Sequence, residues 1–267
     1  MKPLHPWNVS PSTLPHECRG WSSTRAQAEG LRADPERHFR SPSSLAGLSA
    51  IERVSPKKAI QIQEALREQV ILKKTFSKVR TVGGGDAAYA KDEGRLVGVV
   101  VVLSFPQMET LGVATATGKT SFPYIPGLLT FREGPILLKA FQKLEMKPDV
   151  MIFDGQGIAH PRGLGLASHM GLCLDLPSIG CAKTPLFGEF MTPGPRRGDF
   201  EWIRREGKGV GAALRTKDRV KPLFVSPGHR LDLRTSIQIV LACCRGFRIP
   251  EPLRLAHQLS TRICKEI

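Results

Sequence analysis

The chain has 267 residues, of which 41% are hydrophobic and 24% charged, and this composition excludes a collagenous, fibrous or wholly disordered protein. Its 39 Lys and Arg residues against 24 Asp and Glu residues give a net charge of +15, which favours a polyanionic partner such as nucleic acid. The longest apolar run, residues 96–105, is about half as long as the roughly 20 residues that a membrane-spanning helix needs. We therefore expect no association with a membrane.

The first 54 residues are rich in Pro, Ser and Arg and show neither helical nor strand periodicity. We expect residues 1–54 to be a disordered extension and residues 55–267 to be the folded domain. A targeting sequence and a misassigned start codon are the alternatives for the extension. Pro3 and Pro6 interrupt the N-terminus, and the six cysteines are sparse and irregularly spaced, so we expect a cytoplasmic protein with reduced thiols.

The predicted elements alternate between helices and strands. Ser55 and Pro56 predict the start of an amphipathic helix that ends near Lys74. The apolar and β-branched runs after it predict strands over 81–88, 96–103, 111–117, 150–153, 178–181 and 223–226, with helices over 131–144, 164–174 and 233–244. The first three strands are close enough in sequence to form an antiparallel meander. The predicted class is α/β with a mixed central β-sheet flanked by helices.

Residues 196–221 form the most basic segment, with nine Lys or Arg residues, four Asp or Glu residues, and hence a charge of 9 − 4 = +5. Trp202 lies within it. A segment of this kind can lie along a phosphate backbone, and it can equally be a solvated basic hairpin with no ligand. The sequence leaves both interpretations open.

Three acidic residues stand at the ends or starts of predicted elements. Asp154 directly follows the apolar strand 150–153, Asp86 follows three glycines, and Glu133 lies in the first turn of a helix. Each of them taken alone is more typical of a helix cap or a turn. Together they offer three hard oxygen donors, and no set of thiolates competes, so we expect a Mg²⁺ site in which Mn²⁺ can substitute.

A meander strand with one Asp, a following helix and a parallel strand with a second acid is the arrangement of ribonuclease H-like nucleases. Residues from about 80 to 252 also resemble the endonuclease V family. Seven ordered motifs carry the resemblance: Gly85-Asp86, Pro123-Tyr124-Ile125-Pro126-Gly127, Phe131-Arg132-Glu133, Asp154-Gly155-Gln156-Gly157, Ala159-His160-Pro161-Arg162, Gly180-Cys181-Ala182-Lys183 and Gly228-His229-Arg230.

The resemblance implies a monomeric endonuclease that recognises deoxyinosine in DNA and cuts one nucleotide further along on the 3′ side, in repair of deaminated DNA. The catalytic residues that it implies are Asp86, Glu133, Asp154, Lys183 and His229, the three acids also being the metal ligands. The residues that it implies for substrate binding are Gly85, Tyr124, Ile125, Pro126, Gly127, His160 and Arg162. Among these, Tyr124 is expected to act as a wedge that separates the strands at the altered base.

Two other functions remain open at this stage. A nuclease that prefers inosine-containing RNA would use the same site and differ in how the groove treats the 2′-hydroxyl. A protein that binds altered nucleic acid without cutting it would follow if the site were weakened. Two departures from the family pattern bear on this third function. Gln156 stands where many bacterial relatives have a histidine. Gly84-Gly85 replaces larger residues before Asp86, which predicts weaker metal affinity.

Overall fold

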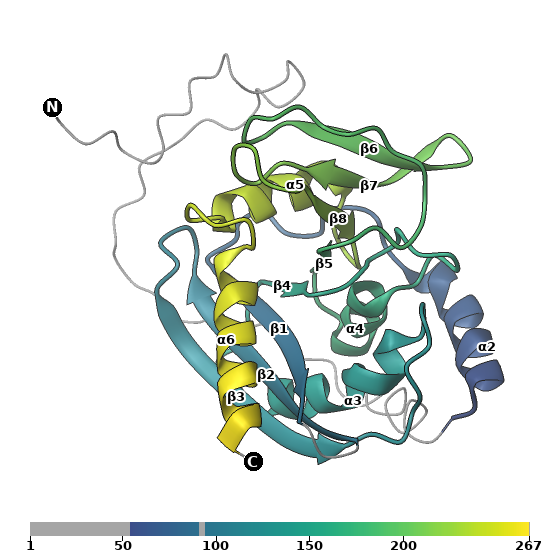
Figure 1. The fold of residues 1–267 in the computed structure, drawn as a ribbon, viewed down its shortest axis with the longest axis vertical. Helices are drawn as coiled ribbons and strands as arrows, with labels where there is room; N and C mark the ends of the chain where they lie inside the picture. The colour runs from purple at the N-terminus through teal and green to yellow at the C-terminus, as the bar shows by residue number, and fades with distance from the viewer. Residues whose placement is uncertain (1–53, 91–93, 267) are drawn as a thin grey trace, which may run out of the picture. The chain divides into compact units, whose positions relative to one another are not determined.

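The computed structural model describes residues 54–90 and 94–266. The expected disordered extension, except for its last residue, and most of the predicted turn at 91–94 lie outside the described residues. The described residues are shown in colour in Figure 1.

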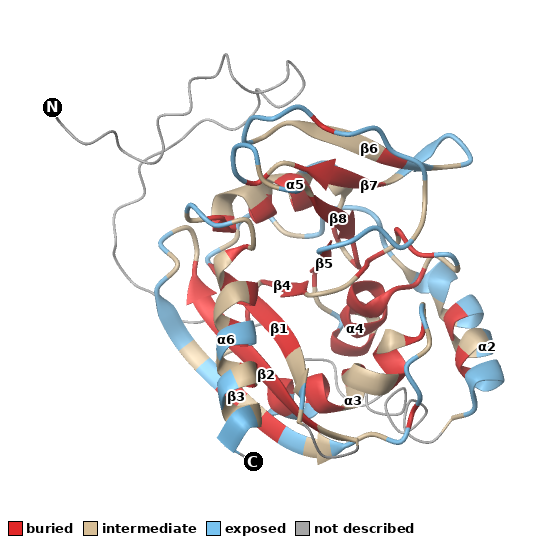
Figure 2. Cartoon of the chain, viewed as in Figure 1, coloured by how far each residue is buried: buried red, intermediate tan, exposed pale blue. Residues whose placement is uncertain are grey.

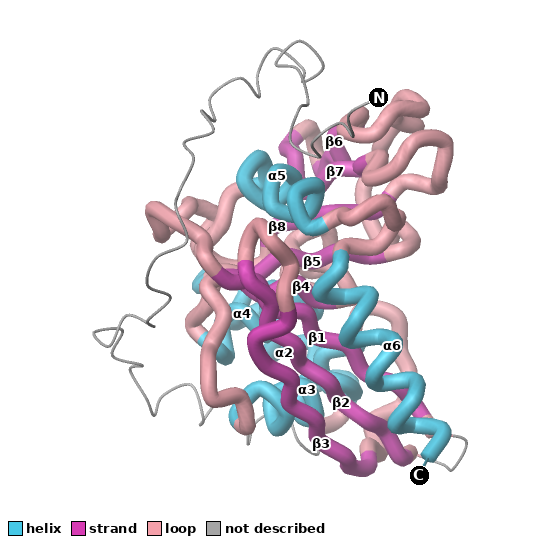
Figure 3. The backbone as a smooth tube through the Cα atoms, turned by 90° about the vertical axis from the view of Figure 1, so that its left-hand side faces the viewer, coloured by secondary structure: helices cyan, strands magenta, loops and turns pink. Residues whose placement is uncertain are grey.

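A single mixed sheet forms the centre of the described fold, as the tube view in Figure 3 shows. Its eight strands lie in the order β3-β2-β1-β4-β5-β8-β7-β6. Their bounds are β1 Thr81–Tyr89, β2 Arg95–Ser104, β3 Thr110–Lys119, β4 Val150–Phe153, β5 Ser178–Ala182, β6 Phe200–Arg205, β7 Lys208–Leu214 and β8 Leu223–Pro227. Strands β1, β2 and β3 form the predicted antiparallel meander, and β4 and β5 run parallel to β1. Strands β8, β7 and β6 complete the sheet in antiparallel pairs.

Helices cover both faces of the sheet. Their bounds are α2 Pro56–Leu66, with a short 3-10 turn η3 at Arg67–Gln69, α3 Leu129–Gln142, α4 Leu166–Leu174, α5 Leu233–Cys243 and α6 Glu251–Glu266. Helices α3 and α4 pack on one face and α5 and α6 on the other. Helix α2 packs against the start of α3 rather than on the sheet. No helix among residues 54–90 and 94–266 is both long and apolar enough to cross a membrane.

Strand β2 shows why the sheet needs this double cover. Its side chains alternate between the two faces, and Val100 and Val102 pack with α3 whereas Val99 and Val101 pack with α6. A strand buried on both faces reads as a continuous apolar run rather than an alternating pattern. Figure 2 shows the result, with β1, β2 and β4 buried almost throughout.

The structure corrects the sequence prediction in three places. The first helix ends at Leu66 and not near Lys74, because Val70 adopts an extended conformation and the next backbone amide bonds outside the helix. The basic segment contains two strands that were not predicted, β6 and β7; residues 211–214 of β7 are buried in the sheet, whereas Arg204 and Lys208 beside the hairpin turn are exposed. Helix α6 was not predicted, although it lies along β1 and β2. The ribonuclease H-like arrangement itself, a mixed sheet with helices on both faces, is confirmed.

Candidate active site

Two carboxylates stand side by side where parallel strands β1 and β4 meet. Gly85 pairs with Phe153 in the sheet register, so Asp86 and Asp154 occupy the next position on each strand. Side chains alternate along a strand, and the even-numbered residues Val82 and Ile152 pack on the face covered by α5 and α6. Asp86 and Asp154 therefore turn toward the same face, at the carboxyl end of β4, where α/β sheets commonly bind ligands.

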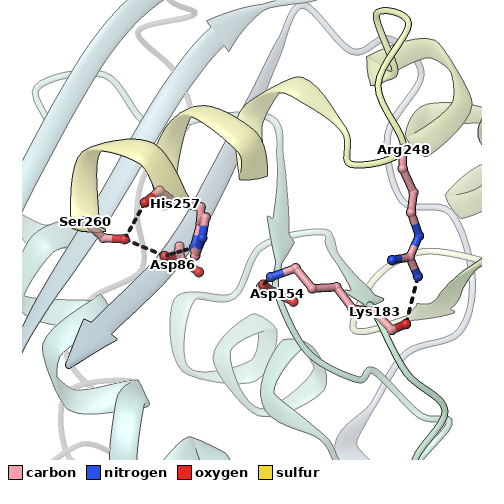
Figure 4. A network of polar contacts seen from close by, with 6 residues as sticks. All are labelled: Asp86, Asp154, Lys183, Arg248, His257 and Ser260. Carbon is pink, nitrogen blue, oxygen red and sulfur yellow. Dashed lines mark hydrogen bonds and ion pairs between the residues drawn. The ribbon is translucent and has the colours of Figure 1, made fainter. Parts of the chain in front are cut away.

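Asp86 is held by helix α6, as Figure 4 shows. Its Oδ2 accepts a hydrogen bond of 2.6 Å from the Ser260 hydroxyl and lies 3.3 Å from His257 Nδ1. Burial raises the pKa of Asp86, and the nearby charge of Asp154 raises it further, whereas the Ser260 hydrogen bond opposes the shift. The imidazole of His257 is 57% exposed, so it connects this buried carboxylate with solvent.

Asp154 forms an ion pair with Lys183, which directly follows β5. Arg248 holds the backbone there, because its Nη2 donates hydrogen bonds of 2.8 Å to the carbonyl oxygens of Lys183 and Pro222. The lysine ammonium thereby lies beside the two aspartates, near the carboxyl ends of the central strands β4 and β5. A cation in this position can contact a phosphate that approaches the carboxylates.

Glu133 comes from helix α3 on the opposite face of the sheet. Its Oε1 accepts a 2.9 Å hydrogen bond from the Tyr89 hydroxyl at the end of β1. Burial raises the pKa of Glu133 to about 7, the Tyr89 hydrogen bond opposes that shift, and the charges of Asp86 and Asp154 add to it. Glu133 is thus electrostatically coupled to both aspartates, although it approaches them from another element.

The donor set suits a hard divalent cation. Among residues 54–90 and 94–266, no three His, Cys, Asp or Glu side chains are arranged so that they would hold a metal ion by themselves. Mg²⁺ does not need such a cage, since it retains several waters and commonly uses one or two carboxylates. The adjacent pair Asp86 and Asp154 fits that requirement, with Glu133 near enough to act on the site electrostatically.

The predicted recognition loop, residues 123–127, exposes one large aromatic ring. Tyr124 is 71% exposed, whereas Ile125 is half-buried and packs against α2. The flanking residues Phe122 and Leu128 are buried in the same small cluster. The two ends of the loop are thus anchored while the tyrosine projects into solvent.

His160 and Arg162 meet this loop from inside the protein. Both the Nε2 of His160 and the Nη2 of Arg162 donate to the Gly127 carbonyl oxygen, at 2.9 and 2.8 Å. The Arg162 amide donates to His160 Nδ1 at 3.2 Å, so the ring is neutral with its proton on Nε2. Burial lowers the pKa of His160 to about 4, which agrees with that state. The structure therefore places these two side chains as supports of the loop.

The structure does not bring His229 to the carboxylates. His229 follows β8, whose end pairs with the start of β5, whereas Lys183 follows the other end of β5. Its Nδ1 accepts the Ile71 amide at 3.3 Å, and its Nε2 lies 3.7 Å from Asp175. The histidine beside the acids is His257, which sequence reasoning missed together with Ser260 and Arg248. The local sequence signal for His257 and Ser260 was their spacing of one helical turn in an amphipathic segment, and Arg248 had no such signal.

Of the two departures from the family pattern, the structure accommodates the glycines, whereas the side-chain oxygen of Gln156 is buried with no hydrogen-bond partner among the described residues. A Cβ atom on Gly84 would lie 2.3 Å from the Pro252 carbonyl, so this glycine allows α6 to approach β1 closely enough to reach Asp86. A Cβ atom on Gly85 would lie 3.0 Å from the Phe153 ring, so the close packing of β1 and β4 favours glycine there, and the expected substrate contact of Gly85 stays a prediction. Gln156 is buried and donates to the Thr184 carbonyl at 3.0 Å, which holds the segment after Lys183. Asp86 is held by Ser260 beside these glycines, and the weaker metal affinity expected from Gly84-Gly85 stays a prediction.

The chain matches known proteins over most of its length. The sequence model of the Endonuclease V family matches residues 64–258. The endonuclease V of Dictyoglomus turgidum is 50% identical over 204 residues, covering 76% of this chain and 89% of the relative. The crystal structure of the endonuclease V of Streptomyces avermitilis superposes with a TM-score of 0.76 at 41% identity, covering 80% of this chain and 95% of that one.

A third match is a structure solved with nucleic acid. Endonuclease V of Ciona intestinalis, in complex with a 24mer DNA containing an inosine followed by a ribo-adenosine, superposes with a TM-score of 0.69 at 31% identity. The match covers 77% of this chain and 96% of that one. From the family match and the identity to curated relatives, this chain belongs to the endonuclease V family of metal-dependent nucleases.

Proposed function

We propose that this protein is a Mg²⁺-dependent endonuclease that recognises deoxyinosine in DNA and hydrolyses the phosphodiester bond one nucleotide 3′ to it, in repair of deaminated adenine. The observation that carries the proposal is the placement of Asp86 and Asp154 at adjacent register positions with Lys183 beside them. The complex of the Ciona relative with inosine-containing DNA supports the choice of substrate.

Residues Asp86 and Asp154 would hold the metal, with Glu133 acting on it directly or through water. Bound Mg²⁺ supplies a Lewis acid that polarises the scissile phosphate and lowers the pKa of the attacking water. Lys183 is paired with Asp154, and its ammonium group can instead contact a phosphate oxygen and stabilise the charge that develops there. The exposed ring of His257 can accept or release a proton beside Asp86. Mn²⁺ can take the place of Mg²⁺ because both accept carboxylate oxygens.

The net charge and the cysteines of the chain support this activity and its location. A net charge of +15 favours encounter with a phosphate backbone and makes binding strongly salt-dependent. We place the activity in the cytoplasm, in a monomer whose catalytic domain is residues 55–267. The sparse cysteines support that placement, and Cys173, Cys181, Cys243, Cys244 and Cys264 are free thiols.

A cleavage assay tests the proposal directly. Purified protein is incubated with end-labelled duplexes that contain one deoxyinosine, with matched adenine duplexes and with inosine-containing RNA, in Mg²⁺, in Mn²⁺ and in EDTA. We expect metal-dependent nicking 3′ to deoxyinosine and no cut in EDTA. Faster cleavage of the RNA would establish an inosine-specific endoribonuclease instead, and binding with no cut in any lane would leave a noncatalytic reader.

A further inference from the structure

Gln63 is a fully buried polar residue in the middle of helix α2. Its side-chain amide nitrogen donates to the carbonyl oxygens of Gly127 at 2.9 Å and Leu164 at 3.0 Å. Its side-chain oxygen accepts a 2.6 Å hydrogen bond from Arg162 Nε. One side chain thus joins α2 to the recognition loop and to the segment that leads into α4. Buried glutamines of this kind require every partner, because an unpaired amide in the interior is costly.

The Gly127 carbonyl is where these contacts converge. It receives hydrogen bonds from three side chains, namely Gln63, His160 and Arg162. Gly127 has a φ of +82°, and a Cβ atom there would lie 2.8 Å from Arg162 Nη2 and 3.1 Å from His160 Nε2. The position therefore favours glycine, because another residue would be strained at this φ and its Cβ atom would crowd the two donors. The C-terminal end of the recognition loop is clamped in one orientation.

Helix α2 also fixes the rest of the loop through apolar contacts. Ala59 is buried in a cluster with Phe122 and Leu128, the residues that flank the loop, and half-buried Ile125 packs against the same cluster. Tyr124 is the aromatic side chain of the loop, and it projects into solvent with 71% of its surface exposed. A ring held on a rigid support loses little conformational entropy when it inserts into a base stack.

We propose that Gln63 is a positioning residue for recognition of the altered base, acting through the Gly127 carbonyl on the loop that carries Tyr124. The inference rests on the proposed function, in which this loop engages the deoxyinosine site. Gln63 directly precedes the residues that the family model matches, which begin at 64. Its hydrogen-bond partners are Gly127, Leu164 and Arg162, and none of them is an acid or the lysine of the active site. We therefore assign its effect to substrate recognition and not to hydrolysis.

Gln63→Leu tests the proposal, because leucine preserves the approximate volume but removes all three hydrogen bonds. We expect KM for a deoxyinosine duplex to rise about tenfold with kcat changed by less than about threefold, which corresponds to a loss of about 1.4 kcal/mol in binding. Preference for deoxyinosine over adenine should fall by a similar factor. Gln61→Leu is the matched control, since Gln61 is exposed on the same helix and should behave as wild type.

Gln63→Glu separates the two halves of the clamp. Glutamate keeps an acceptor for Arg162 but cannot donate to Gly127 or Leu164, so it tests the loop contact even if the leucine variant folds poorly. We expect the same loss of preference for deoxyinosine. A double-mutant cycle with Tyr124→Ala adds the decisive comparison, because two residues acting through one loop should give non-additive losses. Additive losses, or equal losses on deoxyinosine and adenine, would overturn the proposal.

Hydrogen exchange of the protein without nucleic acid keeps this test independent of the proposed function. In Gln63→Leu the amide of Leu128, which donates to the Ile125 carbonyl at 2.9 Å across the loop, should exchange at least about tenfold faster than in wild type, whereas the amides of β1 and β4 should not change. Unchanged exchange in the loop would overturn the positioning role. If the wild-type protein itself showed no preference for deoxyinosine, the proposed function would fail while the exchange result still decided the role of Gln63.

Discussion

Replacing Ser260 by alanine isolates the contribution of helix α6 to the metal site. Ser260 is fully buried and donates its hydroxyl to Asp86 Oδ2 at 2.6 Å. The substitution removes one oxygen atom and leaves Asp86, His257 and the helix backbone in place. Because Asp86 is 7% exposed, water cannot easily replace the lost donor.

The size of the expected effect on metal binding follows from the charge of the acceptor, Asp86. A hydrogen bond to a charged group contributes roughly 1.5–3 kcal/mol, and each 1.4 kcal/mol is about tenfold in an equilibrium constant. Groups that orient metal ligands commonly contribute about 10- to 100-fold in metal affinity or activity. We therefore expect the concentration of Mg²⁺ needed for half-maximal cleavage to rise about 10- to 100-fold in Ser260→Ala.

The pH dependence gives a second signature. Burial already raises the pKa of Asp86, and the Ser260 hydrogen bond lowers it, so removal of the hydroxyl moves the pKa further upward. Metal binding requires the carboxylate, and the deficit of the variant is therefore largest at low pH and shrinks as the pH rises. The acidic limb of the activity profile should shift to higher pH.

The assay is cleavage of a deoxyinosine duplex against Mg²⁺ concentration at several pH values. Ser236→Ala is the matched control, since Ser236 is also a fully buried helical serine but donates to the Asp232 carbonyl on α5. An unchanged Mg²⁺ requirement and an unchanged acidic limb in Ser260→Ala, with both variants folded, would refute the reasoning that α6 tunes Asp86.

Three further predictions concern the acids and the loop. Asp154→Ala should abolish cleavage and leave binding to a deoxyinosine duplex nearly intact, because it removes a metal ligand and not the positive surface; cleavage at nearly the wild-type rate would contradict the metal assignment. Burial raises the pKa of Glu133 from 4.5 to about 7, so between these pH values the folded protein binds a proton that the unfolded chain has released. The thermal stability of the protein in EDTA should therefore fall as the pH rises from about 5 to about 8. Glu133→Gln should flatten that decline in a melting series, and a slope equal to that of the wild type would show that other groups cause it. Tyr124→Ala should weaken discrimination of deoxyinosine from adenine more than nonspecific binding in a titration, whereas equal losses would exclude the wedge.

Local sequence determined the elements that carry the acids. The apolar runs of β2 and β4 predict strands because both faces are buried, and the observed bounds of β4 are those predicted. Asp154 could be placed at a strand end for the same reason, and Asp86 beside it follows from a parallel pairing. The motifs around these residues also identified the family, since they are contiguous stretches of sequence that need no fold to be read.

Only the tertiary structure decided which side chains surround those acids. Ser260 and His257 reach Asp86 across a separation of more than 170 residues, so no local periodicity could reveal them. The role of Gln63 could not be predicted either. The helical pattern predicted that an apolar face is buried, whereas Gln63 is buried as well and bonds to residues on distant loops. Periodicity records which residues leave water, whereas the pairing of buried polar groups is set by chain segments that meet only after folding.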